Sequence, residues 1–127
     1  MRFSQAEKEQ ALISSGERRR ILIARALVHQ PQVLVLDEPS TALDFAANIQ
    51  LTGMLRKLLQ EGRDLLLVTH HPGEIPPEID RVILLRDGRV FADGKKREVL
   101  KSALLSELYD VPLKVAWSHG WCDVRPV

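Results

Sequence analysis

Asp37 and Glu38 stand directly behind four apolar residues, 33–36. Such a run is typical of a strand that is buried on both faces of a parallel sheet. We therefore expect the two carboxylates to lie at the carboxyl edge of that sheet, where open α/β folds place their ligands. There, one carboxylate can face a hydrated magnesium ion while its neighbour faces a water molecule. This is a division of labour that suits the hydrolysis of a nucleotide.

Further candidate groups stand on either side of this pair. Upstream, Ser14, Ser15 and Gly16 come where a helix is expected to begin, and the backbone N–H groups of a helix N-terminus can meet an anion. Downstream, His70 ends a second apolar run. A histidine at a strand end is often structural when it stands alone. The adjacent His71 is expected to point elsewhere, because neighbours on a strand face opposite sides.

Hydrophobic periodicity and turn residues predict an alternation of strands and helices that would carry these groups. Helices are expected at about residues 14–29 and 45–60, with one or two short ones within 95–109. Strands are expected at about residues 33–37, 64–69, 81–86, 89–92 and 111–115, with Asp87-Gly88 as a hairpin turn. Residues 71–77 should form a rigid loop or a short helical turn, and residues 116–127 show no clear pattern. This alternation predicts an α/β fold with a mostly parallel sheet.

Composition excludes several classes of function. The chain has 127 residues and a net charge of +1, so no bulk attraction to nucleic acid or to a membrane is expected. Cys122 is the single cysteine, which precludes an intramolecular disulfide and indicates a reducing compartment. His119 and Cys122 fall short of the four ligands that a structural zinc site needs. No apolar run approaches the ~20 residues of a membrane-spanning helix, so a role at a membrane would be exerted through partners.

In their order, these segments resemble the second half of an ABC-family ATPase, over roughly residues 10–115. The segment Ile13-Ser14-Ser15-Gly16-Glu17 is similar to the family's signature, Leu-Ser-Gly-Gly-Gln/Glu, with isoleucine in place of leucine and Ser15 in place of the first glycine. The strand that ends in Asp37-Glu38 resembles the Walker B strand. Residues 40–44 resemble the D-loop, and His70 resembles the switch histidine. The fold implied is a partial P-loop NTPase core, RecA-like, with a mostly parallel sheet and flanking helices.

The resemblance implies a role for each matching residue. Asp37 would hold magnesium, most simply through bound water, and Glu38 would be the general base or water-orienting group. His70 would reach the γ-phosphate of ATP. The signature residues Ser14, Ser15, Gly16 and Glu17 would contact the γ-phosphate bound to the opposite subunit, so that the active site is shared across a dimer. Asp44 would pass information between the two sites, and it could equally be a plain N-cap of the next helix.

No Gly-x-x-x-x-Gly-Lys-Ser/Thr segment occurs in the sequence, and the family's glutamine loop is also absent. Because the P-loop supplies the amide cradle and the phosphate lysine, we interpret residues 1–127 as the C-terminal part of one ABC ATPase domain, from the signature motif onward. We expect the isolated chain to be inactive as an ATPase. In the family the P-loop strand lies between the strands expected at 64–69 and 81–86. Its absence leaves apolar edges, so we expect the isolated chain to self-associate or to be only marginally stable.

For the complete protein, the resemblance implies the ATP-binding and ATP-hydrolysing subunit of an ABC transporter, with ATP and Mg²⁺ as cofactors. Its partners would be a second ABC ATPase subunit, in a head-to-tail dimer, and membrane permease subunits, and no nucleic acid is expected. It would be cytoplasmic, held at the inner face of the cell membrane through the transporter subunits. Two alternatives stay open: a non-catalytic or truncated ABC module that supplies the signature motif to a partner, and a soluble ABC ATPase that serves no transporter.

Overall fold

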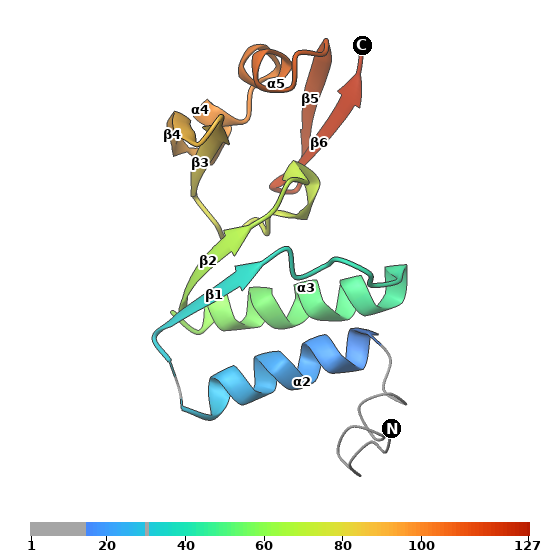
Figure 1. Cartoon of the computed structure of the whole chain (residues 1–127), viewed down its shortest axis with the longest axis vertical. Coiled ribbons are helices and arrows are strands. Elements are labelled where there is room, and N and C mark those ends of the chain that lie inside the picture. The colour runs from blue at the N-terminus through green and yellow to red at the C-terminus, as the bar shows by residue number, and fades with distance from the viewer. Residues whose placement is uncertain (1–14, 30) are drawn as a thin grey trace, which may run out of the picture. The chain divides into compact units, whose positions relative to one another are not determined.

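The computed structural model describes residues 15–29 and 31–127, and the chain divides into two compact units, Met1–Val68 and Thr69–Val127. Each unit has its own hydrophobic core. The first unit contains α2 (Ser15–Val28), β1 (Val33–Asp37), α3 (Phe45–Gln60) and β2 (Asp64–Val68), in that order (Figure 1). The predicted helices and strands of this unit are confirmed, with bounds that differ by one residue at most.

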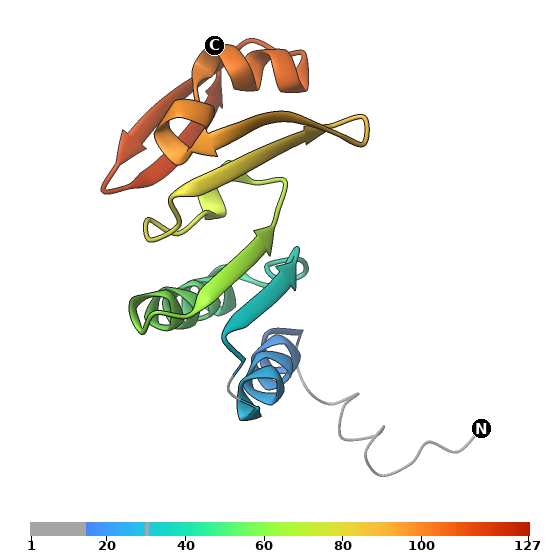
Figure 2. The ribbon, with the colours of Figure 1, turned by 90° about the vertical axis from the view of Figure 1, so that its left-hand side faces the viewer.

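A parallel β-α-β unit forms the frame of the first unit. β1 and β2 pair in parallel, with Val33 opposite Asp64 and Asp37 opposite Val68, and α3 makes the connection between them. Figure 2 shows the two strands side by side, with α3 along them. The helix ends where Gly62 takes a φ of 87°, a conformation that glycine adopts without steric cost. Both strands therefore end at the same edge of the sheet.

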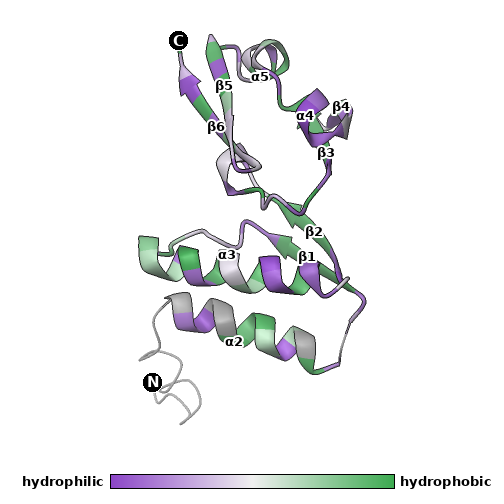
Figure 3. Ribbon diagram, turned by 180° about the vertical axis from the view of Figure 1, so that it is seen from behind, coloured by the Kyte–Doolittle hydropathy of each residue, from purple (hydrophilic) through white to green (hydrophobic). Residues whose placement is uncertain are grey.

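The core of the first unit lies on one face of this sheet. Its buried residues are Ile23 from α2, Leu34 from β1, and Leu51 and Leu55 from α3. The other face carries apolar side chains that are about half exposed: Val33 (53%), Val35 (60%), Leu66 (55%) and Val68 (45%). Figure 3 shows how apolar both strands are. The expectation that the β1 run is buried on both faces is therefore wrong for the described residues, because the helices they contain contribute to a core on one face only.

The second unit contains two antiparallel hairpins and two short helices. Its elements are η1 (Pro72–Glu74), β3 (Arg81–Arg86), β4 (Arg89–Lys95), α4 (Lys96–Val99), α5 (Ser102–Tyr109), β5 (Leu113–Ser118) and β6 (Trp121–Pro126). β3 pairs with β4 and β5 pairs with β6. The α/β class is confirmed, and the parallel part of the expected sheet is the β1–β2 pair. The other two pairs found in the described ranges are antiparallel.

Two-residue turns close both hairpins. Asp87-Gly88 has φ values of 51° and 72°, and His119-Gly120 has φ values of 52° and 83°. Positive φ at both central residues belongs to the type I′ turn, whose twist matches that of paired strands. The first turn was predicted. The second, together with β6, falls in a segment for which no pattern was recognised, although His-Gly followed by an alternating strand is a turn signal.

A buried lysine ties the second unit together. Lys96 is 7% exposed, and its Nζ donates to the carbonyl oxygens of Pro76 (3.3 Å), Pro77 (3.1 Å) and Gly120 (3.5 Å). Burial lowers the pKa of this amine, and the negative charge of Asp80 opposes that shift. The core beside it is built from Val82, Leu84, Val99, Leu100, Leu105 and Cys122. One side chain thus joins the loop after η1, the start of α4 and the turn of the β5–β6 hairpin.

Candidate functional site

The two carboxylates lie where β1 ends. Asp37 is the last residue of β1, and its side chain is exposed. Glu38 follows and continues the strand pairing for one more bond, since its N–H donates to the carbonyl oxygen of Val68 at 2.8 Å. The predicted position at the carboxyl edge of a parallel pair is therefore what the structure shows for both residues. Their roles in binding metal and activating water stay predictions.

Glu38 has an unusual backbone conformation. Its φ is 47°, in the left-handed region that a glutamate rarely occupies. The conformation turns the chain out of the strand, and the Glu38 carbonyl then accepts a hydrogen bond from the Thr41 N–H at 3.2 Å. The side-chain oxygen Oε2 is buried, whereas Asp37 is exposed to solvent. The two neighbouring carboxylates, Asp37 and Glu38, thus differ in solvent exposure, which suits two different chemical roles. Nothing in the sequence around Glu38 signals this backbone turn.

The loop from Glu38 to α3 is held by local hydrogen bonds. The Leu43 N–H donates to the Ser40 carbonyl oxygen at 3.1 Å, and Ala42 takes a φ of 64°. Asp44 caps α3, because its Oδ1 accepts a hydrogen bond from the Ala47 N–H at 2.7 Å. The N-cap alternative for Asp44 is therefore confirmed. Its role in communication between two sites is a separate prediction.

The signature segment is described only in part. Ser14 lies outside the described residues. Ser15 and Gly16 begin α2, and Glu17 lies in its first turn with an exposed side chain. A negative side chain in the first turn suits the positive end of the helix dipole. The expected helix N-terminus therefore exists at this point, while contact between these residues and a nucleotide stays a prediction.

His70 belongs to the second unit, two residues beyond the end of β2. It is exposed, and its ring lies against that of His71, with centroids 3.8 Å apart and planes tilted by 44°. The expectation that His71 points elsewhere is wrong. The alternation of side chains holds only within a strand, and β2 ends at Val68.

Hydrogen bonds fix the backbone around His70. The Thr69 hydroxyl lies 3.1 Å from Glu74 Oε2 and accepts a bond of 3.1 Å from the His71 N–H. The carbonyl oxygen of His70 accepts a bond of 3.3 Å from the hydroxyl of Tyr109, at the end of α5. The sequence gives no local signal for the last contact, because 39 positions separate the two residues.

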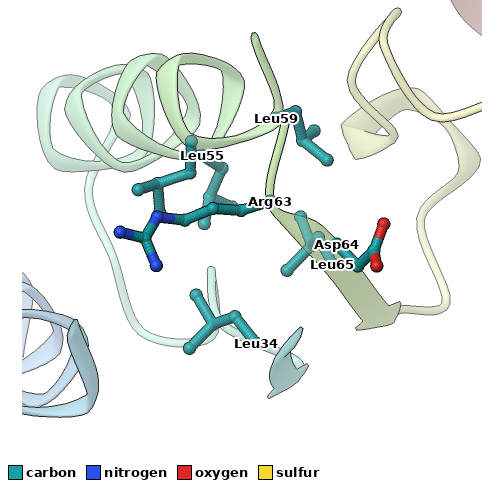
Figure 4. A pocket seen from close by; sticks show the side chains of 7 residues that line it. Leu34, Leu55, Leu59, Arg63, Asp64 and Leu65 are labelled. Carbon is teal, nitrogen blue, oxygen red and sulfur yellow. The ribbon is translucent and has the colours of Figure 1, made fainter. Parts of the chain in front are cut away.

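An apolar pocket in the first unit lies apart from the candidate residues. Its cavity volume is about 10 Å³, the room of about one water molecule, and it is lined by leucines of α3, β1 and β2, with Arg63 and Asp64 at its border (Figure 4). Ligand pockets are typically ~300–1,000 Å³ and hold a few convergent polar groups. We assign this space to packing between helix and sheet.

The donor chemistry at β1 suits magnesium. Mg²⁺ keeps most of its water and is commonly held by one or two carboxylates together with substrate phosphates, so a single exposed carboxylate such as Asp37 fits. A metal site made only of protein ligands needs several such side chains close together. The described ranges contain no cluster of three or more His, Cys, Asp or Glu side chains that could hold a metal. The same ranges contain no helix that is both long and apolar enough to span a membrane.

Comparison with known proteins places these features in a family. The sequence model of the ABC transporter family matches residues 2–41. The uncharacterized ABC transporter ATP-binding protein YlmA of Bacillus subtilis is 40% identical over 116 residues, which are 90% of this chain and 44% of that protein. The chain thus spans less than half the length of this relative.

Solved structures agree with the sequence comparison. A protein described as a metal-chelate type ABC transporter, in an inward-facing conformation, superposes with a TM-score of 0.80 at 28% identity, over 91% of this chain and 47% of that one. The ATP-binding cassette MJ0796, a dimer in a post-hydrolysis state with ADP and phosphate, superposes with a TM-score of 0.58 at 34% identity, over 67% of this chain and 37% of that one. The chain belongs to the ABC transporter ATP-binding protein family.

Proposed function

We propose that this chain is the C-terminal part, from the signature motif onward, of one ABC ATPase domain that binds and hydrolyses ATP as a subunit of an ABC transporter. The observation that carries the proposal is the pair Asp37-Glu38 at the carboxyl edge of the parallel β1–β2 pair, with Glu38 turned out of the strand at a φ of 47°. An apolar strand that ends in two carboxylates with different exposure suits one metal ligand and one group that activates water.

Each residue has a defined task in this proposal. Asp37 would hold Mg²⁺ through bound water, and the ion would neutralise phosphate charge when it is bound. Glu38 orients the attacking water and accepts its proton. The exposed imidazole of His70 contacts the γ-phosphate. Asp37 and His70 act by positioning and by electrostatic stabilisation, which dominate the catalysis of phosphoryl transfer, and Glu38 adds proton transfer.

The signature residues act on a second nucleotide. Ser14, Ser15, Gly16 and Glu17 stand at the N-terminus of α2, where backbone N–H groups and the helix dipole favour an anion. We assign them to the ATP held by a second ABC ATPase subunit, in a head-to-tail dimer. The dimeric state of MJ0796 supports this arrangement. Asp44 caps α3, and we assign to its loop the communication between the two sites. Permease subunits would keep the complete protein at the cytoplasmic face of a membrane.

A second candidate function follows from the sequence itself. The 127 residues contain no Gly-x-x-x-x-Gly-Lys-Ser/Thr segment. A chain without that segment would supply its signature motif to the nucleotide bound by a partner. It would not itself bind and hydrolyse ATP. Reading the coding sequence upstream of Met1 for an in-frame P-loop distinguishes this module from part of a working ATPase.

Glu38→Gln in the complete ATPase tests the proposed chemistry. The substitution keeps the shape of the side chain and removes the base, so ATP turnover should fall by ~10²–10⁴-fold. Glu61→Gln is the matched control, because Glu61 is exposed at the end of α3 and has no assigned role. Steady-state phosphate release measures both variants. Turnover by Glu38→Gln at the rate of the control would overturn the assignment of Glu38.

The isolated chain gives an independent test. Residues 1–127 should show no ATPase activity, because the cradle for the phosphates is absent from this sequence. Phosphate release by the purified chain that Glu38→Gln abolishes would contradict the proposal that these residues are one part of the catalytic domain.

A further inference from the structure

Tyr109 connects the C-terminal part of the second unit to the backbone of His70. Its hydroxyl donates to the His70 carbonyl oxygen at 3.3 Å, across 39 positions of sequence. The hydroxyl therefore acts on the peptide that joins His70 to His71, the two residues whose rings lie together. This bond therefore restrains the rotation of the peptide that follows the His70 imidazole.

The phenol is held by a rigid helix. Tyr109 is the last residue of α5, and Leu105 one turn earlier is 0% exposed. Ser106 joins α5 to β5, because its hydroxyl donates to the Leu113 carbonyl oxygen at 3.2 Å and accepts from the Leu113 N–H at 2.9 Å. Asp110 ends the helix with a φ of 54°. The helix that carries the phenol is therefore anchored in the core of the second unit, while the Tyr109 residue itself is 44% exposed.

The hydroxyl is a donor throughout the neutral range. Partial burial raises the pKa of Tyr109 above its ordinary value, so the phenol keeps its proton at any physiological pH. A carbonyl oxygen can only accept, so the direction of this hydrogen bond is settled by chemistry. On the other side, Thr69 contacts both Glu74 and the His71 N–H. The peptide after His70 is thus held from both ends.

We propose that Tyr109 is a positioning residue for His70, which it holds through the backbone carbonyl in the direction needed to meet the γ-phosphate. This inference rests on the proposed function of His70. It assigns a catalytic consequence to α5, an element outside the segments that resemble the family's motifs. The contact of Tyr109 with the candidate site is made through the backbone carbonyl of His70. Its effect therefore belongs to the chemical step and not to the binding of ATP.

Tyr109→Phe is the direct test, because it removes one oxygen atom and keeps the ring. In the complete ATPase, kcat should fall by about 3–10-fold with KM for ATP unchanged, the effect of one hydrogen bond on a positioned group. Thr69→Val should act in the same way, and Thr69→Ser should restore the rate. Ser118→Ala is the matched control, since it removes a hydroxyl whose 3.0 Å hydrogen bond is to the ring of the neighbouring His119.

A second measurement separates failure of this inference from failure of the proposed function. In the complete ATPase without nucleotide, Tyr109→Phe should shift the imidazole NMR signals of His70 and weaken the NOE between the rings of His70 and His71, whereas Ser118→Ala should change neither. Unchanged signals in Tyr109→Phe would overturn the positioning role whether or not ATP is hydrolysed. Full kcat in Tyr109→Phe, in an enzyme that His70→Ala inactivates, would overturn it as well. Full activity of His70→Ala would instead refute the proposed function.

Discussion

Replacing Glu38 with glycine should make the first unit more stable than replacing it with alanine. Both variants lose the carboxylate, so they differ only in how readily they adopt the φ of 47° seen at this position. A left-handed conformation costs a residue with a Cβ about 1–2 kcal/mol, and glycine avoids that cost. The greater freedom of glycine in the unfolded chain offsets about 0.5–1 kcal/mol of the gain. The expected difference is therefore about 1 kcal/mol in favour of glycine, or about 4–8 °C in Tm for a unit of this size.

Thermal unfolding followed by circular dichroism measures this difference in stability. Pairs of glycine and alanine variants at two other positions serve as controls, one for each expected order of stability. Asp87 has a φ of 51° in the β3–β4 turn and no proposed function, so its glycine variant should again be more stable than its alanine variant. Glu61 has a φ of −79°, so there the order should reverse, because glycine gains nothing at an ordinary φ. If the glycine variant at Glu38 is no more stable than the alanine variant while both controls behave as expected, Glu38 is not held in the left-handed region.

Other predictions concern the core of the second unit. Gly120→Ala should lower the free energy of unfolding by more than about 1 kcal/mol, because the position has a φ of 83° and a Cβ there would lie 2.9 Å from the Cβ of Pro77. Chemical denaturation measures this loss. An unchanged denaturation midpoint would contradict the packing of this turn against Pro77. Cys122 is 4% exposed and should react with a thiol reagent only when the unit opens, so native and denatured chains should differ strongly in labelling rate. Burial raises the pKa of Cys122 above its ordinary value, so at alkaline pH the native state keeps a proton that the unfolded chain loses. Stability should therefore decline as the pH rises through the ordinary thiol pKa, and Cys122→Ala should remove that dependence.

The elements nearest the carboxylates could be predicted because local signals agree there. The run ending at Asp37 has the length of a strand, and α3 has an aspartate cap, an apolar stripe and a glycine stop. What those signals cannot reveal is which faces of a strand are covered. Val35 and Leu34 are equally apolar, yet one is 60% exposed and the other 7% exposed, because burial depends on the elements that pack against each face.

The site was predictable in its residue types and less so in its supports. Side-chain chemistry and order pointed to Asp37, Glu38 and His70. The left-handed turn at Glu38 was not predictable, since it is stabilised by bonds to neighbouring elements and glutamate has no preference for it. Tyr109 could not be found either. Its contact with His70 depends on how α5 docks on the core of its unit, which no local pattern reports.

The packing of β6 against η1 has a consequence for the order of folding. Gly73, in η1, lies so near β6 that a Cβ there would be 3.3 Å from the carbonyl oxygen of Cys122. The segment beside His70 is thus completed by the strand that the ribosome synthesises last among the elements of this unit. Contacts across so many residues close late, whereas the β-α-β frame around Asp37 is already made when they form. During synthesis the carboxylates should acquire their native surroundings first, and the backbone of His70 should become protected only after residues 121–126 have left the ribosome.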